Sequence, residues 1–157
     1  KGMLGPAITQ TVNTPDLMAE AGLTYHTDWF IDDQPVPINV RSGKLVSVPY
    51  SIDTNDLAGT DAQGHDAPYW AQAVKDQFDV LYRQGATNGR VMCVVLHPFW
   101  FGQPHRVKYL EDALSHILSF DGVWMTTADD IADYYIENYY DQMVAHLASR
   151  RQPAATG

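Results

Sequence analysis

His97 is the side chain in this sequence best suited to acid–base chemistry. It ends the apolar run VMCVVL (residues 91–96) and is followed at once by Pro98, Phe99 and Trp100. An imidazole titrates near neutral pH and can pass a proton to a leaving nitrogen or oxygen. The alternative is a structural histidine bonded to backbone, and the sequence favours neither. Trp100 either caps a pocket or packs on a neighbouring helix.

Further carboxylates gather in two other segments. DWFIDDQP (residues 28–35) contains Asp28, Asp32 and Asp33 beside Trp29. Carboxylates there can orient an imidazole, accept a proton or bind a polar ligand, whereas Asx turns are the structural alternative. SIDTND (residues 51–56) is equally open between loop structure and the rim of a pocket.

Several known catalytic and metal-binding motifs are absent from the sequence. The other histidines lack the spacing of a metalloprotease site, and no GxSxG turn, glycine-rich phosphate loop or catalytic cysteine arrangement occurs. We therefore assign no metal ligand in this chain, and most phosphoryl-transfer and serine-hydrolase functions are excluded.

The order of predicted elements indicates an α/β fold. Helical spacing and capping residues predict helices over residues 14–22, 66–85, 106–119 and 127–150, and Thr14, Asp66 and Thr127 are the predicted N-cap residues of the first, second and last of these. Short apolar runs between them predict strands at 23–29, 44–52, 90–99 and 122–127. Alternating strands and helices favour parallel pairing, and continuous apolar runs such as VMCVVL suit strands buried on both faces. Functional residues of such folds lie beyond the carboxyl ends of the strands. Polar and aromatic residues follow all four predicted strands here.

Composition limits the partners and the compartment. The 157 residues are enough for one domain, and 45% of them are apolar. A net charge of −9 argues against nucleic acid and anionic membranes. No apolar stretch approaches the roughly 20 residues that span a bilayer. The single Cys93 excludes a disulfide framework and fits a reducing compartment, so we expect a cytoplasmic protein.

The motifs, taken in order, resemble a known family. Residues 2–36, SVPYSIDTND (47–56), LHPFWFGQPHR (96–106) and WMTTADDIADYY (124–135) resemble the C-terminal part of the polysaccharide deacetylase superfamily. The resemblance is closest to its allantoinase-like and cyclic-imide-hydrolase-like branch. It implies that residues 1–147 form the C-terminal half of an irregular (β/α) barrel, with a flexible tail over 148–157, and that the protein hydrolyses carbon–nitrogen bonds other than peptide bonds.

The resemblance also implies residue roles. His97 matches the general acid, and Asp28 matches the carboxylate that supports it. The substrate-binding residues it implies are Trp29, Asp32, Asp33, Pro35, Trp100, Gly5 and Pro6. The family's Arg-x-Pro motif reads Leu4-Gly5-Pro6 here, so its arginine is absent. This departure argues against an ordinary polysaccharide deacetylase.

The family's catalytic base and metal ligands belong to a barrel half that this sequence does not contain. We therefore expect a complementary N-terminal chain or half-barrel, an oligomer, and a base supplied by that partner. The cofactor is unknown; a divalent metal such as zinc would find its ligands there. The predicted function is an amidohydrolase for a small cyclic amide, ureide or imide. The alternatives are an N-acetyl-sugar deacetylase for chitin or peptidoglycan, a non-catalytic metabolite- or carbohydrate-binding subunit, and a purely structural role.

Overall fold

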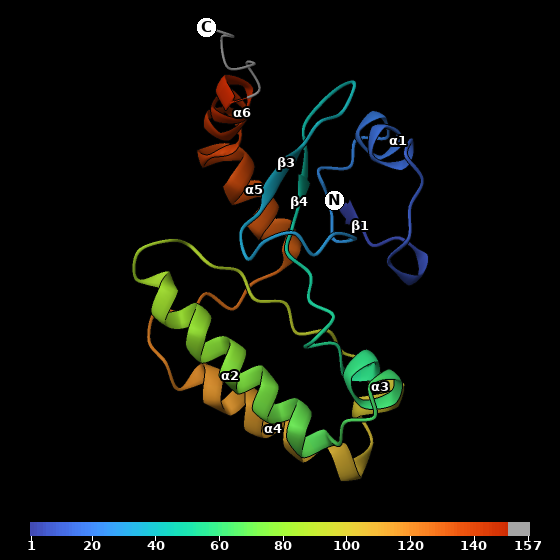
Figure 1. Cartoon of the computed structure of the whole chain (residues 1–157), viewed down its shortest axis with the longest axis vertical. Helices are drawn as coiled ribbons and strands as arrows, with labels where there is room; N and C mark the ends of the chain where they lie inside the picture. The colour runs from blue at the N-terminus through green and yellow to red at the C-terminus, as the bar shows by residue number, and fades with distance from the viewer. Residues whose placement is uncertain (151–157) are drawn as a thin grey trace, which may run out of the picture. The chain divides into compact units, whose positions relative to one another are not determined.

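The computed structural model describes residues 1–150, which form two compact units (Figure 1). The first unit joins residues 1–48 to the segment that begins at Thr126, and the second comprises Pro49–Met125. No helix within residues 1–150 is long and apolar enough to cross a membrane.

The first unit contains a sheet of short strands in the order β1-β2-β4-β3. Strands β1 (Gly2–Met3), β2 (Tyr25–His26) and β4 (Leu45–Ser47) pair in parallel; the sequence predicts parallel pairing and the strands β2 and β4, but not β1. Strand β3 (Val36–Ile38) was not predicted and pairs antiparallel with β4. Gly43, with φ of +72°, lies in the connection between them, where the left-handed region favours glycine.

Strand β4 is buried on both faces because successive side chains point to opposite sides. Leu45 packs in a cluster with Met18 of helix α1 (Thr14–Glu20) and with Ile38. The next residue, Val46, packs with Ala132 of helix α5 (Ala128–Asn138). The sheet thus lies between a helix on each face, which is the layering expected of an α/β fold.

The second unit is built on two parallel helices, α2 (Ala67–Gly85) and α4 (Pro104–Leu118), which lie side by side (Figure 1). Their direction follows from paired contacts: Lys75 meets Asp112, and one turn further along both helices Asp79 meets His116. Their core also contains Phe101 of the one-turn helix α3 (Pro98–Phe101). The π-helix η2 (Ala58–Ala62) precedes α2.

All four predicted helices are present, with differences at their ends. The Asp66 and Thr127 side chains cap α2 and α5 as predicted, by accepting from the backbone N–H three residues later. Asn13 rather than Thr14 is the N-cap residue of α1. The last predicted helix breaks at Tyr139, where φ is −132°, and continues as α6 (Tyr140–Arg150).

The prediction of strands at 90–99 and 122–127 was wrong. Within the described part of the chain, only Val95 of the first segment forms a bridge, with Asn55, and residues 91–95 are half-buried. A strand requires a ladder of neighbours, and the second unit offers this segment only the short stretch around Asn55. Of the predicted flexible tail 148–157, residues 148–150 are the last residues of α6 and the rest lies outside the described residues, so its flexibility stays a prediction.

The turn after β1 holds non-glycine residues in the left-handed region. Ala7 has φ of 52° and lies exposed in the short 3-10 turn η1 (Pro6–Ile8), next to Ile8 at 61°. Left-handed backbone costs an L-residue about 1–2 kcal/mol.

We therefore expect Ala7→Gly to raise the free energy of unfolding by about 1 kcal/mol, because glycine adopts this conformation without a Cβ clash. Urea denaturation measures the change. Ala145→Gly, at an exposed position inside α6, is the matched control and should lower stability by about 1 kcal/mol. Equal losses in both variants would show that Ala7 is not strained.

Candidate active site

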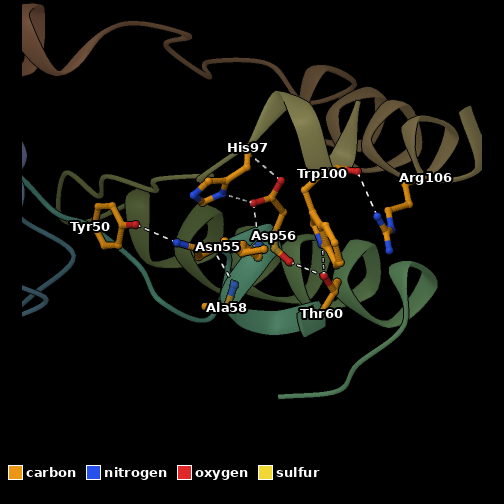
Figure 2. Close-up of polar contacts among 9 residues, drawn as sticks. Tyr50, Asn55, Asp56, Ala58, Thr60, His97, Trp100 and Arg106 are labelled. Atoms are coloured by element: carbon orange, nitrogen blue, oxygen red, sulfur yellow. Dashed lines mark hydrogen bonds and ion pairs between the residues drawn. The ribbon is translucent and has the colours of Figure 1, made fainter. Parts of the chain in front are cut away.

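A short parallel backbone pairing brings Asp56 beside His97 (Figure 2). The Val95 N–H donates to the Thr54 carbonyl at 3.2 Å, and the Asp56 N–H donates to the Val95 carbonyl at 3.1 Å. The Thr54 hydroxyl donates to the Cys93 carbonyl at 2.6 Å. The residues that follow these two paired stretches must therefore lie together.

Asp56 holds His97 at two points. Its Oδ2 accepts the His97 backbone N–H at 2.8 Å, and its Oδ1 lies 2.6 Å from His97 Nδ1. Asp56 Oδ1 also accepts the Leu57 N–H at 2.7 Å. An ionised carboxylate only accepts, so Nδ1 carries the hydrogen of this pair. The other ring nitrogen, Nε2, makes no hydrogen bond within residues 1–150 and is available to a ligand.

Burial differs across this pair in a way that suits proton transfer. The Asp56 side chain is 0% exposed, whereas the His97 side chain is 31% exposed. A buried carboxylate that accepts several hydrogen bonds is a fixed acceptor, and charge-assisted bonds of this kind are the strong ones. The imidazole is thus bonded to a buried carboxylate through Nδ1, while part of the ring remains exposed.

The loop that carries Asp56 is fixed by its neighbour Asn55. Asn55 Oδ1 accepts the N–H groups of Leu57 at 3.0 Å and Ala58 at 2.9 Å, and its Nδ2 donates to the Tyr50 hydroxyl at 2.9 Å (Figure 2). Burial raises the pKa of Tyr50, so its phenol stays protonated at neutral pH. Of the two interpretations of SIDTND, loop structure agrees with the Asn55 contacts, and the pocket-rim interpretation stays a prediction.

Trp100 packs inside the second unit. Its Nε1 donates to the Thr60 hydroxyl at 2.6 Å, and the Arg106 guanidinium lies over its ring at 3.9 Å (Figure 2). The ring also packs against the core of α2 and α4. The packing alternative, rather than the pocket cap, agrees with these contacts.

Asp28 belongs to a second buried polar cluster, in the first unit. Its Oδ1 accepts the Gly5 N–H at 2.6 Å, and its own N–H donates to His26 Nδ1 at 3.2 Å. A Cβ at Gly5 would lie 2.3 Å from the Thr9 carbonyl oxygen, so glycine is required there. The prediction that Asp28 supports His97 stays a prediction; within its own unit, Asp28 contacts Gly5 and His26, and the carboxylate bonded to His97 in the second unit is Asp56.

Trp29 is the predicted pocket residue that borders a cavity. Its ring meets His26 edge-to-face at 4.7 Å. The cavity has a volume of about 360 Å³, a size typical of small-molecule sites. Its lining, all in the first unit, comprises Gln10, Thr11, Val12, Pro15, Asp16, Trp29, Ile38 and Asn39.

The remaining predicted substrate-binding residues lie on loops of the first unit. Asp32, Asp33 and Pro35 follow Trp29 before β3, with Asp32 exposed and the other two half-buried. Pro6 is exposed at the start of η1. None of these four is among the described residues that line the cavity, and their roles stay predictions.

The described residues do not fit a metal centre by themselves. Across residues 1–150, no group of three or more His, Cys, Asp or Glu side chains is placed to hold a metal ion. Each of the three histidine–aspartate pairs among these residues contributes only two such side chains. We therefore derive no chemical step through a metal.

Sequence reasoning left Asp56 undecided, although a signal for it existed. Asp56 and His97 both follow apolar runs, so parallel pairing of these runs would place both at one edge. Instead, the Asp28-Trp29 pair led to the prediction that Asp28 is the carboxylate that supports His97.

Comparisons with known proteins were made for the whole chain. No family model matches it. A Schizosaccharomyces pombe protein carries the name "Putative polysaccharide deacetylase" and is 32% identical to this chain over an alignment of 120 residues. The alignment covers 69% of this chain and 37% of that protein. The crystal structure of a probable polysaccharide deacetylase from Pseudomonas aeruginosa PAO1 matches with a TM-score of 0.76 and 33% identity, over 83% of this chain and 45% of that one.

An allantoinase has a similar structure. The crystal structure of the Puue allantoinase matches with a TM-score of 0.77 and 32% identity, over 83% of this chain and 44% of that one. The chain thus spans less than half the length of each of these proteins.

The buried His26 predicts acid sensitivity. Burial lowers the pKa of His26 below 6.5, against the opposing effect of Asp28. The unfolded chain therefore binds a proton near pH 6.5 that the folded protein does not bind, and stability is lost as the pH falls below that value. The loss from this one group is at most about 1.4 kcal/mol per pH unit.

We expect His26→Gln to lose less stability than the wild type between pH 7.5 and 5.5, as measured by urea denaturation at each pH. His146→Gln, an exposed histidine of α6, is the control and should keep the wild-type dependence. An unchanged pH dependence in His26→Gln would contradict a buried neutral imidazole.

Proposed function

From its homology to the polysaccharide deacetylases, by sequence and by structure and with an allantoinase among its homologues, we propose that this chain is part of a hydrolase acting on carbon–nitrogen bonds other than peptide bonds. The partial coverage of these relatives fits a C-terminal part of such a protein. The substrate we propose is a small cyclic amide, ureide or imide. The observation that carries the proposal is that buried Asp56 bonds both the backbone N–H and the Nδ1 atom of His97.

In the proposed reaction His97 is the general acid. Water adds to the substrate carbonyl carbon, the carbon–nitrogen bond breaks, and the departing nitrogen takes the proton from His97 Nε2. Asp56 fixes the ring through Nδ1 and stabilises its positive charge before the transfer. The base that takes the proton from water is not assigned to any residue of this chain.

We further propose that a complementary N-terminal half-barrel supplies the base and any divalent metal. Two observations support such a partner. The relatives are more than twice as long as the part that this chain matches. The apolar segment 91–95 is only half-buried, and Val95 is its single bridged residue among those described. A strand edge of this kind is a surface for further pairing.

An N-acetyl-sugar deacetylase is the second candidate function. The names of the yeast and Pseudomonas proteins favour it, whereas Leu4 in place of the family arginine argues against it. Assays of the assembled protein with hydantoin and succinimide, and with chitin oligomers, separate the two. Ring-opened carboxylate supports the cyclic-amide proposal, and released acetate supports the deacetylase.

We expect His97→Gln to lower kcat/KM by about 100- to 10,000-fold, the range for removal of a general acid or base. Circular dichroism and the urea midpoint should stay close to those of the wild type, since a glutamine amide can still donate to Asp56. His105→Gln, an exposed histidine at the start of α4, is the matched control and should keep full activity. Wild-type turnover by a folded His97→Gln variant would rule out the assignment.

We expect Asp56→Asn to act through His97. The double variant Asp56→Asn/His97→Gln should therefore be little slower than the slower single variant, because coupled residues are not additive. Asp79→Asn combined with His97→Gln is the comparison, and its losses should add, since Asp79 belongs to the same unit but contacts His116 instead. Additive losses for Asp56 and His97 would refute the coupling.

A further inference from the structure

Phe99 is an exposed aromatic residue next to the candidate acid. It is 66% exposed, and its ring centroid lies 5.7 Å from that of His97 with the planes at 75°. We propose that Phe99 supports the flat ring of the substrate while His97 protonates its nitrogen, and thereby determines the preference for cyclic substrates. This inference rests on the proposed function and names a specificity-determining residue for it.

The backbone fixes Phe99 in its outward position. The N–H groups of Trp100 and Phe101 both donate to the His97 carbonyl, at 2.8 and 3.0 Å, so the turn of α3 starts at His97 itself. Phe101 is 1% exposed and packs on Trp70 at 4.3 Å. Gln103 Nε2 donates to the Phe99 carbonyl at 3.1 Å. A turn anchored on both sides of Phe99 presents its ring at little entropic cost on binding.

Trp100 does not compete for this role. Its indole nitrogen is bonded to Thr60, and the Arg106 guanidinium lies over its ring (Figure 2). Arg106 also donates to the Trp100 carbonyl at 3.2 Å, which holds the cation in place. The half-buried Trp100 ring has a cation over it and packs against the core, so it offers a substrate less exposed surface than Phe99 does. Phe99 is therefore the aromatic side chain that the α3 turn leaves available.

The distances favour a ring contact rather than a contact with the reacting atoms. A nitrogen that takes a proton from His97 Nε2 lies about 2.6–3.2 Å from it. Aromatic rings interact at centroid separations of about 4.5–7 Å, so a small flat ring held at Nε2 falls within reach of Phe99. Phe99 has no proton to transfer. Its contact therefore affects substrate binding and KM more than kcat.

The test separates binding from turnover. Calorimetry measures the binding of hydantoin and succinimide to the assembled protein that contains the chain, with His97→Gln present to prevent hydrolysis. Adding Phe99→Ala should weaken binding about 3- to 10-fold, the range expected for one aromatic contact. Phe99→Tyr should restore it. Tyr69→Ala, which removes a 55% exposed aromatic of α2, is the matched control and should change nothing.

The outcomes are distinguishable from those of the proposed function. Unchanged binding in Phe99→Ala overturns the inference, as does an equal loss in Tyr69→Ala. With His97 intact, Phe99→Ala should raise KM and leave kcat within about 2-fold; a loss in kcat alone also overturns it. Ring binding that depends on Phe99 without any turnover leaves the inference standing and removes the hydrolase proposal. Absence of ring binding to the parent protein removes both.

Discussion

The second unit depends on one buried carboxylate. Asp56 is fully buried, and a carboxylate removed from water is stable only when its oxygens accept enough hydrogen bonds. Its partners come from two places: the Leu57 N–H follows it in the chain, while the His97 N–H and Nδ1 arrive from more than 40 residues away. Any movement of one loop against the other would break these bonds and leave the charge unpaired, at a cost of several kcal/mol.

The helices supply the frame that keeps the two loops in register. Helices α2 and α4 run parallel, and the polypeptide that connects them contains the Val95 bridge and the α3 turn. Phe101, at the end of that turn, is part of the same core as Trp70 and Ala113. The apolar core therefore positions His97 indirectly: it fixes α3, and α3 starts at the His97 carbonyl. Packing and hydrogen bonding in this unit favour the same arrangement of the loops.

Local signals in the sequence were sufficient for the helices and for strands β2 and β4, and insufficient for the other segments. Asp66 and Thr127 cap helices because their side chains reach an N–H only three residues away, so short-range chemistry decides the outcome. The run VMCVVL has the composition of a buried strand, but a ladder needs a neighbour, and composition does not supply one. Strand β3 was missed for the converse reason, since its pairing with β4 depends on the turn at Gly43 rather than on an apolar run.

The same distinction applies to the candidate site. The residue types of His97 and Asp28 were predicted from their motifs, yet the partner of His97 depends on which loops the fold brings together. The histidine–aspartate pairs that contain His97 and Asp28 have different surroundings. His97 is in contact with Asp56 at 2.6 Å and partly exposed, while His26 is fully buried, with its Nδ1 at 3.9 Å from the Asp28 carboxylate.

These different environments suit the two histidines to different roles. An imidazole that bonds a carboxylate on one nitrogen and faces outward with the other can take up and release a proton. Burial lowers the pKa of His26, so that ring stays neutral and accepts the Asp28 N–H instead. A neutral acceptor fixes the backbone at Asp28, whose carboxylate then fixes Gly5. His97 is therefore the residue that we propose for proton transfer, and the buried pair of the first unit holds the loops that carry Trp29 and Gly5.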